Sequence, residues 1–156
     1  MKKPISQLIE ETWNTNQSFD VDSEEYKYIK KTVKVFFNKL DQGDIRLCTQ
    51  ISQGQWQLNE WVKKGILIAF KIFQNEIFNS GFAVYYDKIH PKFDAASWDE
   101  DNFASLNIRV VPGSYVRKGV YLGKNVIIMP AFLNVGVYIG ASSMIDSGAT
   151  IGSGVQ

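Results

Sequence analysis

The chain has 156 residues, of which 45% are hydrophobic and 21% are charged, and its formal net charge is +1. This composition excludes a disordered chain and is typical of a folded globular protein. The longest apolar run, residues 65–70, is too short to span a membrane and the N-terminus lacks the pattern of a secretion signal, so we expect a cytoplasmic protein without membrane partners.

Periodic apolar side chains predict two helices at the start of the chain. Residues 5–13 carry one apolar face and are followed by the polar stretch 14–18. In the second helix Asp22 can act as N-cap with Glu25 three residues later, and an apolar stripe of period 3.6 runs until Gly43. We therefore expect both helices to pack through one apolar face.

Four lysines lie on the opposite face of the second helix, at Lys27, Lys30, Lys31 and Lys34. One interpretation is a patch that binds anions. A row of like charges on a helix is more often a solvated face, and the sequence favours that simpler interpretation.

Residues 45–107 predict alternating strands and helices. Residues 45–58 read as a β-hairpin, and residues 60–73 as a helix that is apolar on most sides and therefore central to the packing. Residues 82–89 resemble a strand, and Ser97 can cap a short helix over residues 97–105 with a glutamate three positions later. These elements predict an α+β domain over residues 1–107.

Few residues outside the repeats carry chemistry. His90 is the only histidine and lies before a proline in a polar loop, where a surface role is commoner than catalysis. Cys48 is the only cysteine, so the chain has no internal disulfide and no thiolate metal site. No metal-ligand spacing, phosphate loop, nucleophile elbow or dinucleotide motif is present, and we expect no bound metal.

From residue 108 onward a six-residue pattern replaces every other periodicity. An aliphatic residue recurs at every sixth position, with one residue dropped after the third unit, and an apolar or small residue follows four positions later. The inward series is Val116, Leu122, Ile128, Leu133, Ile139, Ile145 and Ile151, followed by Val120, Val126, Phe132, Val137, Ser143, Ala149 and Val155.

This period fits neither an amphipathic helix nor a half-buried strand. It is typical of a left-handed parallel β-helix, in which three short strands form one coil and the aliphatic residues stack inside. Glycines after the aliphatic position, at Gly123, Gly140 and Gly152, suit sharp or crowded corners. We therefore predict a second domain over residues 108–156, the first coils of a left-handed β-helix.

The charge of this second part is mildly basic. Residues 108–156 contain four basic residues and one acid. That excess suits an anionic ligand, but it does not form the dense basic stripe of a nucleic-acid-binding protein. We do not expect nucleic acid as a partner.

Two charged residues of the repeats are candidates for a site. Asp146 is the only acid there and occupies a position where three other units have glycine. It is either a turn aspartate that bonds its own corner or a carboxylate that holds or deprotonates an amine. Arg109 lies at the domain junction, where its guanidinium could clamp a substrate carboxylate or form a salt bridge between the domains.

Five segments together resemble the tetrahydrodipicolinate N-succinyltransferase family, whose members are hexapeptide-repeat acyltransferases. The specific signal is the order of three motifs, W-V-K-K in a helix, R-V-V-P at the junction and M-I-D in a coil. The five segments are residues 61–72, 85–89, 109–112, 129–136 and 144–153.

The resemblance implies transfer of succinyl from succinyl-CoA to the amine of 2-amino-6-oxopimelate, the opened form of tetrahydrodipicolinate, in lysine and diaminopimelate biosynthesis. It implies a cytoplasmic homotrimer with sites between subunits, succinyl-CoA as co-substrate and no tightly bound cofactor. Arg109 matches the family's substrate-binding arginine in R-V-V-P. Asp146 matches the substrate-binding and catalytic aspartate of M-V-D, with isoleucine here in place of valine.

The resemblance also has a departure. Family members continue through further coils after the position that matches Gln156, and a catalytic glutamate and most of the CoA groove lie there. We therefore expect a C-terminally truncated chain with its CoA-binding residues unassigned. Two alternatives stay open: another hexapeptide N-acetyltransferase, which would typically use a histidine that residues 108–156 lack, and a non-catalytic trimerisation or interaction module.

Overall fold

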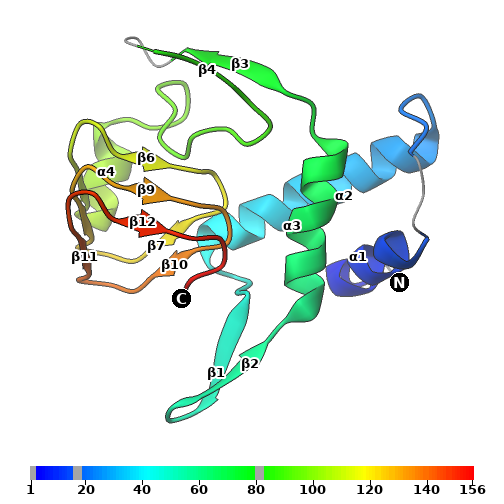
Figure 1. Cartoon of the computed structure of the whole chain (residues 1–156), viewed down its shortest axis with the longest axis horizontal. Coiled ribbons are helices and arrows are strands. Elements are labelled where there is room, and N and C mark those ends of the chain that lie inside the picture. Colours follow the sequence, from blue (N-terminus) through cyan, green and yellow to red (C-terminus); the bar gives the residue numbers. More distant parts are fainter. Residues whose placement is uncertain (1–2, 16–18, 80–82) are drawn as a thin grey trace.

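The computed structural model describes residues 3–15, 19–79 and 83–156 of the chain (Figure 1). An N-terminal α+β region precedes a stack of two-residue parallel strands. The helices are α1 (Ile5–Asn14), α2 (Glu24–Gln42), α3 (Glu60–Ile72) and α4 (Glu100–Leu106). The hairpin strands are β1 (Cys48–Ser52) with β2 (Gln55–Leu58), and β3 (Glu76–Asn79) with β4 (Val84–Asp87).

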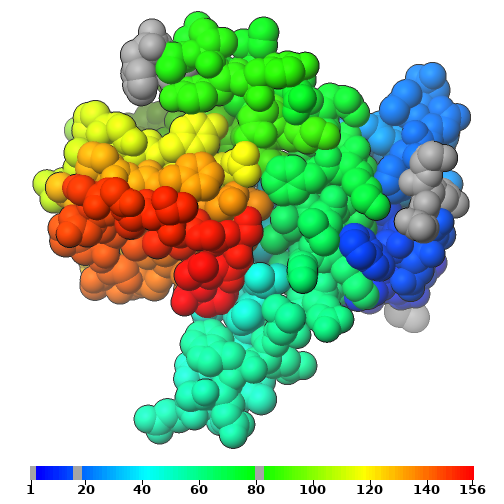
Figure 2. Space-filling model, viewed as in Figure 1, coloured from blue at the N-terminus to red at the C-terminus, as the bar shows by residue number. Residues whose placement is uncertain are grey.

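The stacked strands follow in chain order from the end of α4. They are β5 (Arg109–Val110), β6 (Tyr115–Val116), β7 (Tyr121–Leu122), β8 (Ile127–Ile128), β9 (Phe132–Leu133), β10 (Tyr138–Ile139), β11 (Met144–Ile145) and β12 (Thr150–Ile151). Figure 2 shows this stack in contact with the helical region, while the hairpin of β1 and β2 projects away from both.

The expected helices are present, but two of their caps were predicted wrongly. The N-cap of α2 is Ser23 rather than Asp22, because the Ser23 hydroxyl accepts the backbone N–H of Tyr26 at 3.1 Å. In α4, Asp99 forms the capping box with Asn102, not Ser97 with Glu100. In both cases a cap residue near the expected one offers the better-placed oxygen.

The two predicted strand regions differ in outcome. The hairpin expected over residues 45–58 is confirmed as β1 and β2. Of the strand expected over residues 82–89, β4 covers Val84–Asp87, and residue 82 lies outside the described part of the chain. Its antiparallel partner β3 had no clear alternation in the sequence and was missed.

Helix α3 is central to the helical core, as its apolar composition predicts, because it packs against both α1 and α2. The fully buried ring of Phe36 in α2 lies edge-on to Trp61 of α3, with ring centroids 5.9 Å apart. Gly65 provides the space for that ring: a Cβ there would lie 2.6 Å from the Phe36 ring. Tyr26 also donates its hydroxyl to the carbonyl of Ile72 at 2.8 Å.

The stack consists of three parallel ladders, β5–β8–β11, β6–β9–β12 and β7–β10. Within each ladder a strand pairs with the strand one coil later, so that Arg109 lies beside Ile127 and Ile127 beside Met144. Three strands and three corners therefore make each coil, which is the arrangement expected of the first coils of a β-helix.

The inward aliphatic series is confirmed for the first five units, whose side chains are at most 7% exposed, and the last two, Ile145 and Ile151, pack against the same cluster while partly exposed. One member of the second series was predicted wrongly. Phe132 lies on the outer face, stacked with Tyr115 at 6.1 Å between centroids, and Ala131 takes the inward position. The dropped residue thus lies in the corner between Ile128 and Ala131, within the third unit rather than after it.

The corners contain a second repeat that the sequence analysis missed. A residue with positive φ recurs every six positions, beginning with Gly113, Gly119 and Asn125, and the series breaks only at the shortened corner. Of the glycines predicted to relieve crowding, Gly123 does so, since a Cβ there would lie 2.5 Å from the backbone nitrogen of Ala141. Gly152 has no atom within 4 Å of such a Cβ.

Polar and aromatic contacts join the stack to the helical region. Asp41 at the end of α2 accepts the backbone N–H of Gly119 at 2.9 Å. The Arg46 guanidinium lies 3.6 Å from the ring centroid of Tyr138, which is stacked on Tyr121 at 4.3 Å. The helical core even includes Val135 from the coils. These contacts fix the outer faces of the stack relative to α2 and its neighbours.

Candidate active site

Both predicted site residues lie on one outer face of the stack, along the ladder β5–β8–β11. Arg109 begins a column that continues with Ile127 and Met144 in the next two coils. A neighbouring column contains Val111, Met129 and Asp146, one residue from each coil. Val111 and Met129 donate their backbone N–H groups to Ile128 O and Ile145 O of the next coil, at 2.9 Å each, which fixes this register. We name these two columns the outer strip.

The ladder geometry sets the separation of the two charges. Parallel strands lie about 4.8 Å apart, so the backbones of Arg109 and Met144 are separated by about 10 Å along the stack. Asp146 comes two residues after Met144, at the following corner. The repeat therefore places a cation and a carboxylate on the same face, two coils apart.

Arg109 is held by its backbone and free at its side chain. Its N–H donates to the carbonyl of Val126 at 3.0 Å, and the side chain is exposed. The guanidinium has no hydrogen-bond or ion-pair partner among residues 3–15, 19–79 and 83–156, so the salt bridge between domains considered from the sequence is not formed there. A free guanidinium fork on a rigid strand suits a carboxylate ligand.

Asp146 forms the corner contacts that one of the two interpretations considered from the sequence expects. Its Oδ1 accepts the backbone N–H of Ser147 at 2.7 Å, and its carbonyl accepts the N–H of Ala149 at 3.2 Å, so it does bond its own corner. The residue is exposed, and its Oδ2 has no partner within the described part of the chain. One oxygen is therefore fixed by the turn, while the other is available to a ligand's proton.

Between the two charges the outer strip is apolar. Ile127 and Met129 are partly exposed, and Met144 is 58% exposed. A flexible thioether beside a carboxylate suits the methylene groups of a ligand whose polar ends reach the charges. The strip can thus bind a carboxylate, an apolar linker and an amine in sequence.

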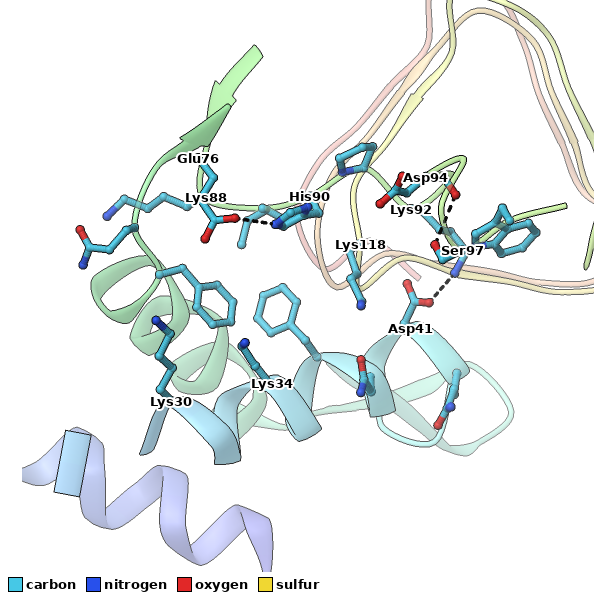
Figure 3. A pocket seen from close by; sticks show the side chains of 18 residues that line it. Lys30, Lys34, Asp41, Glu76, Lys88, His90, Lys92, Asp94, Ser97 and Lys118 are labelled. Carbon is cyan, nitrogen blue, oxygen red and sulfur yellow. Dashed lines mark hydrogen bonds and ion pairs between the residues drawn. The ribbon is translucent and has the colours of Figure 1, made fainter. Parts of the chain in front are cut away.

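A second group of ionisable residues lines a hollow beside α2, away from the outer strip ladder (Figure 3). The lysine row of α2 divides there: Lys30 and Lys34 line the hollow, whereas Lys27 pairs with Glu24 at 2.7 Å. Lys27, Lys31 and Lys34 are exposed and Lys30 is partly exposed, so the row is a solvated face, and two of its lysines also border the hollow. His90 also lines the hollow, with its Nε2 3.0 Å from Glu76, a carboxylate that lies 14 residues away in the sequence and was not anticipated.

Lys92 forms the inner wall of this hollow. It is only 6% exposed, and its Nζ lies 2.9 Å from Asp41. Burial lowers the pKa of the Lys92 ammonium, and the attraction of Asp41 opposes that shift. The ion pair is thus a structural link between α2 and the loop before the coils.

Among the described residues, no group of three or more histidine, cysteine or acidic side chains is placed to hold a metal ion. In the same part of the chain, none of the helices has the length and apolarity needed to cross a membrane.

Comparisons with known proteins agree with the motifs of the sequence. Residues 4–72 match a family model described as "Tetrahydrodipicolinate N-succinyltransferase N-terminal". Three relatives are each called 2,3,4,5-tetrahydropyridine-2,6-dicarboxylate N-succinyltransferase. The protein of Dechloromonas aromatica is 35% identical over 156 residues, which is 100% of this chain and 56% of the relative.

The other two relatives give the same result. The protein of Bartonella bacilliformis is 36% identical over 154 residues, or 97% of this chain and 53% of its own length. That of Rickettsia felis is 43% identical over 128 residues, or 82% and 46%. The chain therefore spans about half the length of the curated relatives it matches, and the family resemblance predicted from the sequence is confirmed over that span.

Proposed function

We propose that this chain, a relative of tetrahydrodipicolinate N-succinyltransferases over the length it spans, supplies the amine-binding half of an N-succinyltransferase site. The acceptor is the amine of 2-amino-6-oxopimelate, formed from tetrahydrodipicolinate, and the donor is succinyl-CoA. The observation that carries the proposal is the outer strip, where the Arg109 guanidinium and the Asp146 carboxylate flank an apolar surface. Within the described part of the chain the guanidinium has no partner, and the carboxylate uses only one of its oxygens.

In this proposal Arg109 binds a carboxylate of the acceptor through two parallel hydrogen bonds. The rest of the acceptor lies over the apolar part of the strip. Its amine then reaches Asp146, whose Oδ2 is free while Oδ1 is fixed by Ser147. Fixing one oxygen orients the other, so the acceptor is positioned before the donor arrives.

The chemical step needs no covalent intermediate on the enzyme. An amine is protonated and unreactive at neutral pH, and Asp146 accepts or orients the proton that the nitrogen loses. The nitrogen lone pair attacks the thioester carbonyl, the C–N bond forms and the C–S bond breaks. The nitrogen loses its second proton to the departing thiolate, so CoA leaves as its thiol. The product is the N-succinyl amide.

Several properties of the family extend this proposal. The coils wind left-handed, the second domain begins near residue 108, and three copies of the chain assemble with sites between neighbouring subunits. Succinyl-CoA is a co-substrate rather than a bound cofactor, and the protein acts in the cytoplasm on lysine and diaminopimelate precursors. The exposed position of the outer strip supports a site completed by a neighbouring subunit.

Thiol release tests the assignment with the protein that carries this sequence. We expect free CoA thiol from succinyl-CoA only when tetrahydrodipicolinate is present, and little from acetyl-CoA. Reaction with acetyl-CoA alone would instead assign an N-acetyltransferase. Trimers that release no thiol from either donor would support the non-catalytic module and contradict the proposal.

A further inference from the structure

The hollow beside α2 has a volume of about 540 Å³ (Figure 3). Its walls come from α2, from the end of α3, from the loop over residues 88–98 and from Lys118 at the corner between β6 and β7. That volume lies within the range of small-molecule pockets, which is about 300–1,000 Å³. We name it the α2 pocket.

Positive charge dominates the lining of the α2 pocket. Five lysines and three acids line it, and two of the acids already have partners. Asp41 is bonded to Lys92 and to the backbone of Gly119, and Glu76 is bonded to His90. The lysines are Lys30, Lys34, Lys88, Lys92 and Lys118, and the acids are Asp41, Glu76 and Asp94.

The lysines themselves fall into two groups. Lys92 is engaged by Asp41, and Lys88 donates to the carbonyl of Phe70 at 2.7 Å. Lys30, Lys34 and Lys118 have no carboxylate partner among the described residues, and the ammonium of Lys30 makes only a distant contact, 6.0 Å, with the Tyr26 ring. Figure 3 shows Lys30 and Lys34 entering the pocket from α2 and Lys118 entering from the opposite wall.

Three ammonium groups without carboxylate partners border the same pocket, and like charges repel one another more strongly beside a low-dielectric wall than in bulk water. An anion between them removes that repulsion and gains attraction from each. Asp41 and Glu76 already bind Lys92 and His90, and the third acid, Asp94, accepts the backbone N–H of Ala96. Five lysines against three acids leave the lining with a net positive charge, which an external anion can offset.

The rest of the lining suits the body of an organic ligand. Phe37 and Phe73 lie edge-on with centroids 5.5 Å apart, and Trp98 closes another side. Asn38, Gln42 and Ser97 add hydrogen-bonding groups at the rim. Apolar walls with a few polar groups are typical of small-molecule sites.

We propose that the α2 pocket binds a small organic anion with at least two negative charges, held by Lys30, Lys34 and Lys118 and packed against Phe37 and Phe73. The charges are those of a phosphate ester or of a polycarboxylate. The site is separate from the outer strip and requires no chemistry. Because Lys118 belongs to the coils and Lys30 and Lys34 to α2, a ligand there bridges the two parts of the molecule and stabilises their contact.

Calorimetric titration of the full chain tests this site with four probes: pyrophosphate, adenosine monophosphate, citrate and neutral adenosine. We expect the anions to bind and the affinity to fall as salt is raised, because the attraction is partly screened. Preference for the two phosphates or for citrate identifies the source of the charge, and either supports the site. Binding of adenosine as tight as that of the monophosphate would contradict it.

Charge reversal localises the binding. Lys34→Glu and Lys118→Glu should each weaken anion binding by at least about tenfold, because each turns an attraction at short range into a repulsion. Lys31→Glu is the matched control, since Lys31 is exposed on the same helix and does not line the pocket. Equal weakening by all three variants would mean non-specific attraction and overturn the proposal.

A second measurement covers variants that lose stability. Lys34→Gln and Lys118→Gln remove the charge and keep a polar side chain that is one atom shorter, and calorimetric titration measures the anion binding that remains. Retained binding in both neutral variants, with circular dichroism unchanged, would also overturn the proposal.

Discussion

The coil stack and the helical region bury similar kinds of side chains by different routes. In the stack, each inward residue lies on its equivalent one coil later, as Leu133 lies beside Val116 in β6–β9. In the helical region, Phe36 meets Trp61 and Gly65 of another helix, with no repeat to relate them. A repeat therefore encodes its packing in its sequence, whereas a helical core depends on contacts between distant segments.

The largest loss of stability is expected in the helical core, where no repeat relates the buried side chains to one another. Phe36→Ala should lower the free energy of unfolding by about 3–5 kcal/mol, because the ring is fully buried and its removal leaves a cavity. Urea denaturation measures the change. Val35→Ala, on the same helix with its side chain 44% exposed, is the control and should change stability much less.

Position along the stack should grade the next effect. Leu133→Ala, in the middle of the described coils and fully buried, should cost about 2–5 kcal/mol. Ile151→Ala should cost clearly less, because Ile151 is only partly buried in the last strand. Thermal and urea unfolding compare the two variants, and equal losses would show that burial does not grade along the columns.

Gly123 and Gly152 occupy the same position of the repeat but differ in how crowded they are. Substitutions at both therefore test whether crowding is the reason for glycine at this position. Gly123→Ala should cost about 1–3 kcal/mol, since the new Cβ would lie 2.5 Å from backbone that cannot move aside easily. Gly152→Ala should stay within about 0.5 kcal/mol, because open space surrounds that position. If both variants unfold at the same urea concentration, corner crowding is not the reason for glycine at position 123.

The smallest effect on stability is expected at alkaline pH, from Tyr115 and Tyr121 on the outer faces of the coils. Burial raises the pKa of Tyr115, with further help from Asp87, and burial together with Tyr138 raises the pKa of Tyr121. Above the ordinary tyrosine pKa, about 10, the unfolded chain releases protons that the folded chain keeps, so stability falls as pH rises.

Replacing either tyrosine by phenylalanine should therefore reduce the loss of unfolding free energy as the pH rises. Unfolding free energies measured between about pH 8 and pH 11 for Tyr115→Phe and Tyr121→Phe give the slope, and Tyr28→Phe, 56% exposed, is the control. A slope unchanged in both variants would show that these two hydroxyls do not cause it.

The same contrast explains what could be predicted from the sequence. The repeat placed Val116, Leu122 and Leu133 inside and set Asp146 at an exposed corner, because six-residue spacing maps directly onto position in a coil. The prediction was wrong at Phe132, because the spacing alone does not fix where the dropped residue falls. The stacking of Phe132 on Tyr115 places its side chain on the outer face.

In the helical region the sequence predicted elements but not their meeting points. The pairing of Glu76 with His90 and the pocket that both Lys34 and Lys118 line join segments that no local pattern connects. The missed strand β3 follows from the same cause, since its pairing with β4 rather than its own alternation defines it. Contacts of this kind arise from tertiary packing, which periodicity does not encode.

We propose that the coil repeat positions Arg109 and Asp146 as one acceptor site. Steady-state succinyl transfer should show Asp146→Asn lowering kcat by roughly 10²–10⁴-fold. Asparagine keeps an oxygen for the Ser147 N–H, so the corner is preserved. Arg109→Lys should mainly raise KM, since a lysine cannot form the bidentate contact.

Ser147→Ala and Lys124→Ala are the matched controls, because they alter exposed neighbours in the same stack without removing either proposed contact. The account predicts near-normal kcat and KM for both controls, loss of kcat in Asp146→Asn and raised KM in Arg109→Lys. A kcat for Asp146→Asn equal to that of the unaltered protein would contradict it.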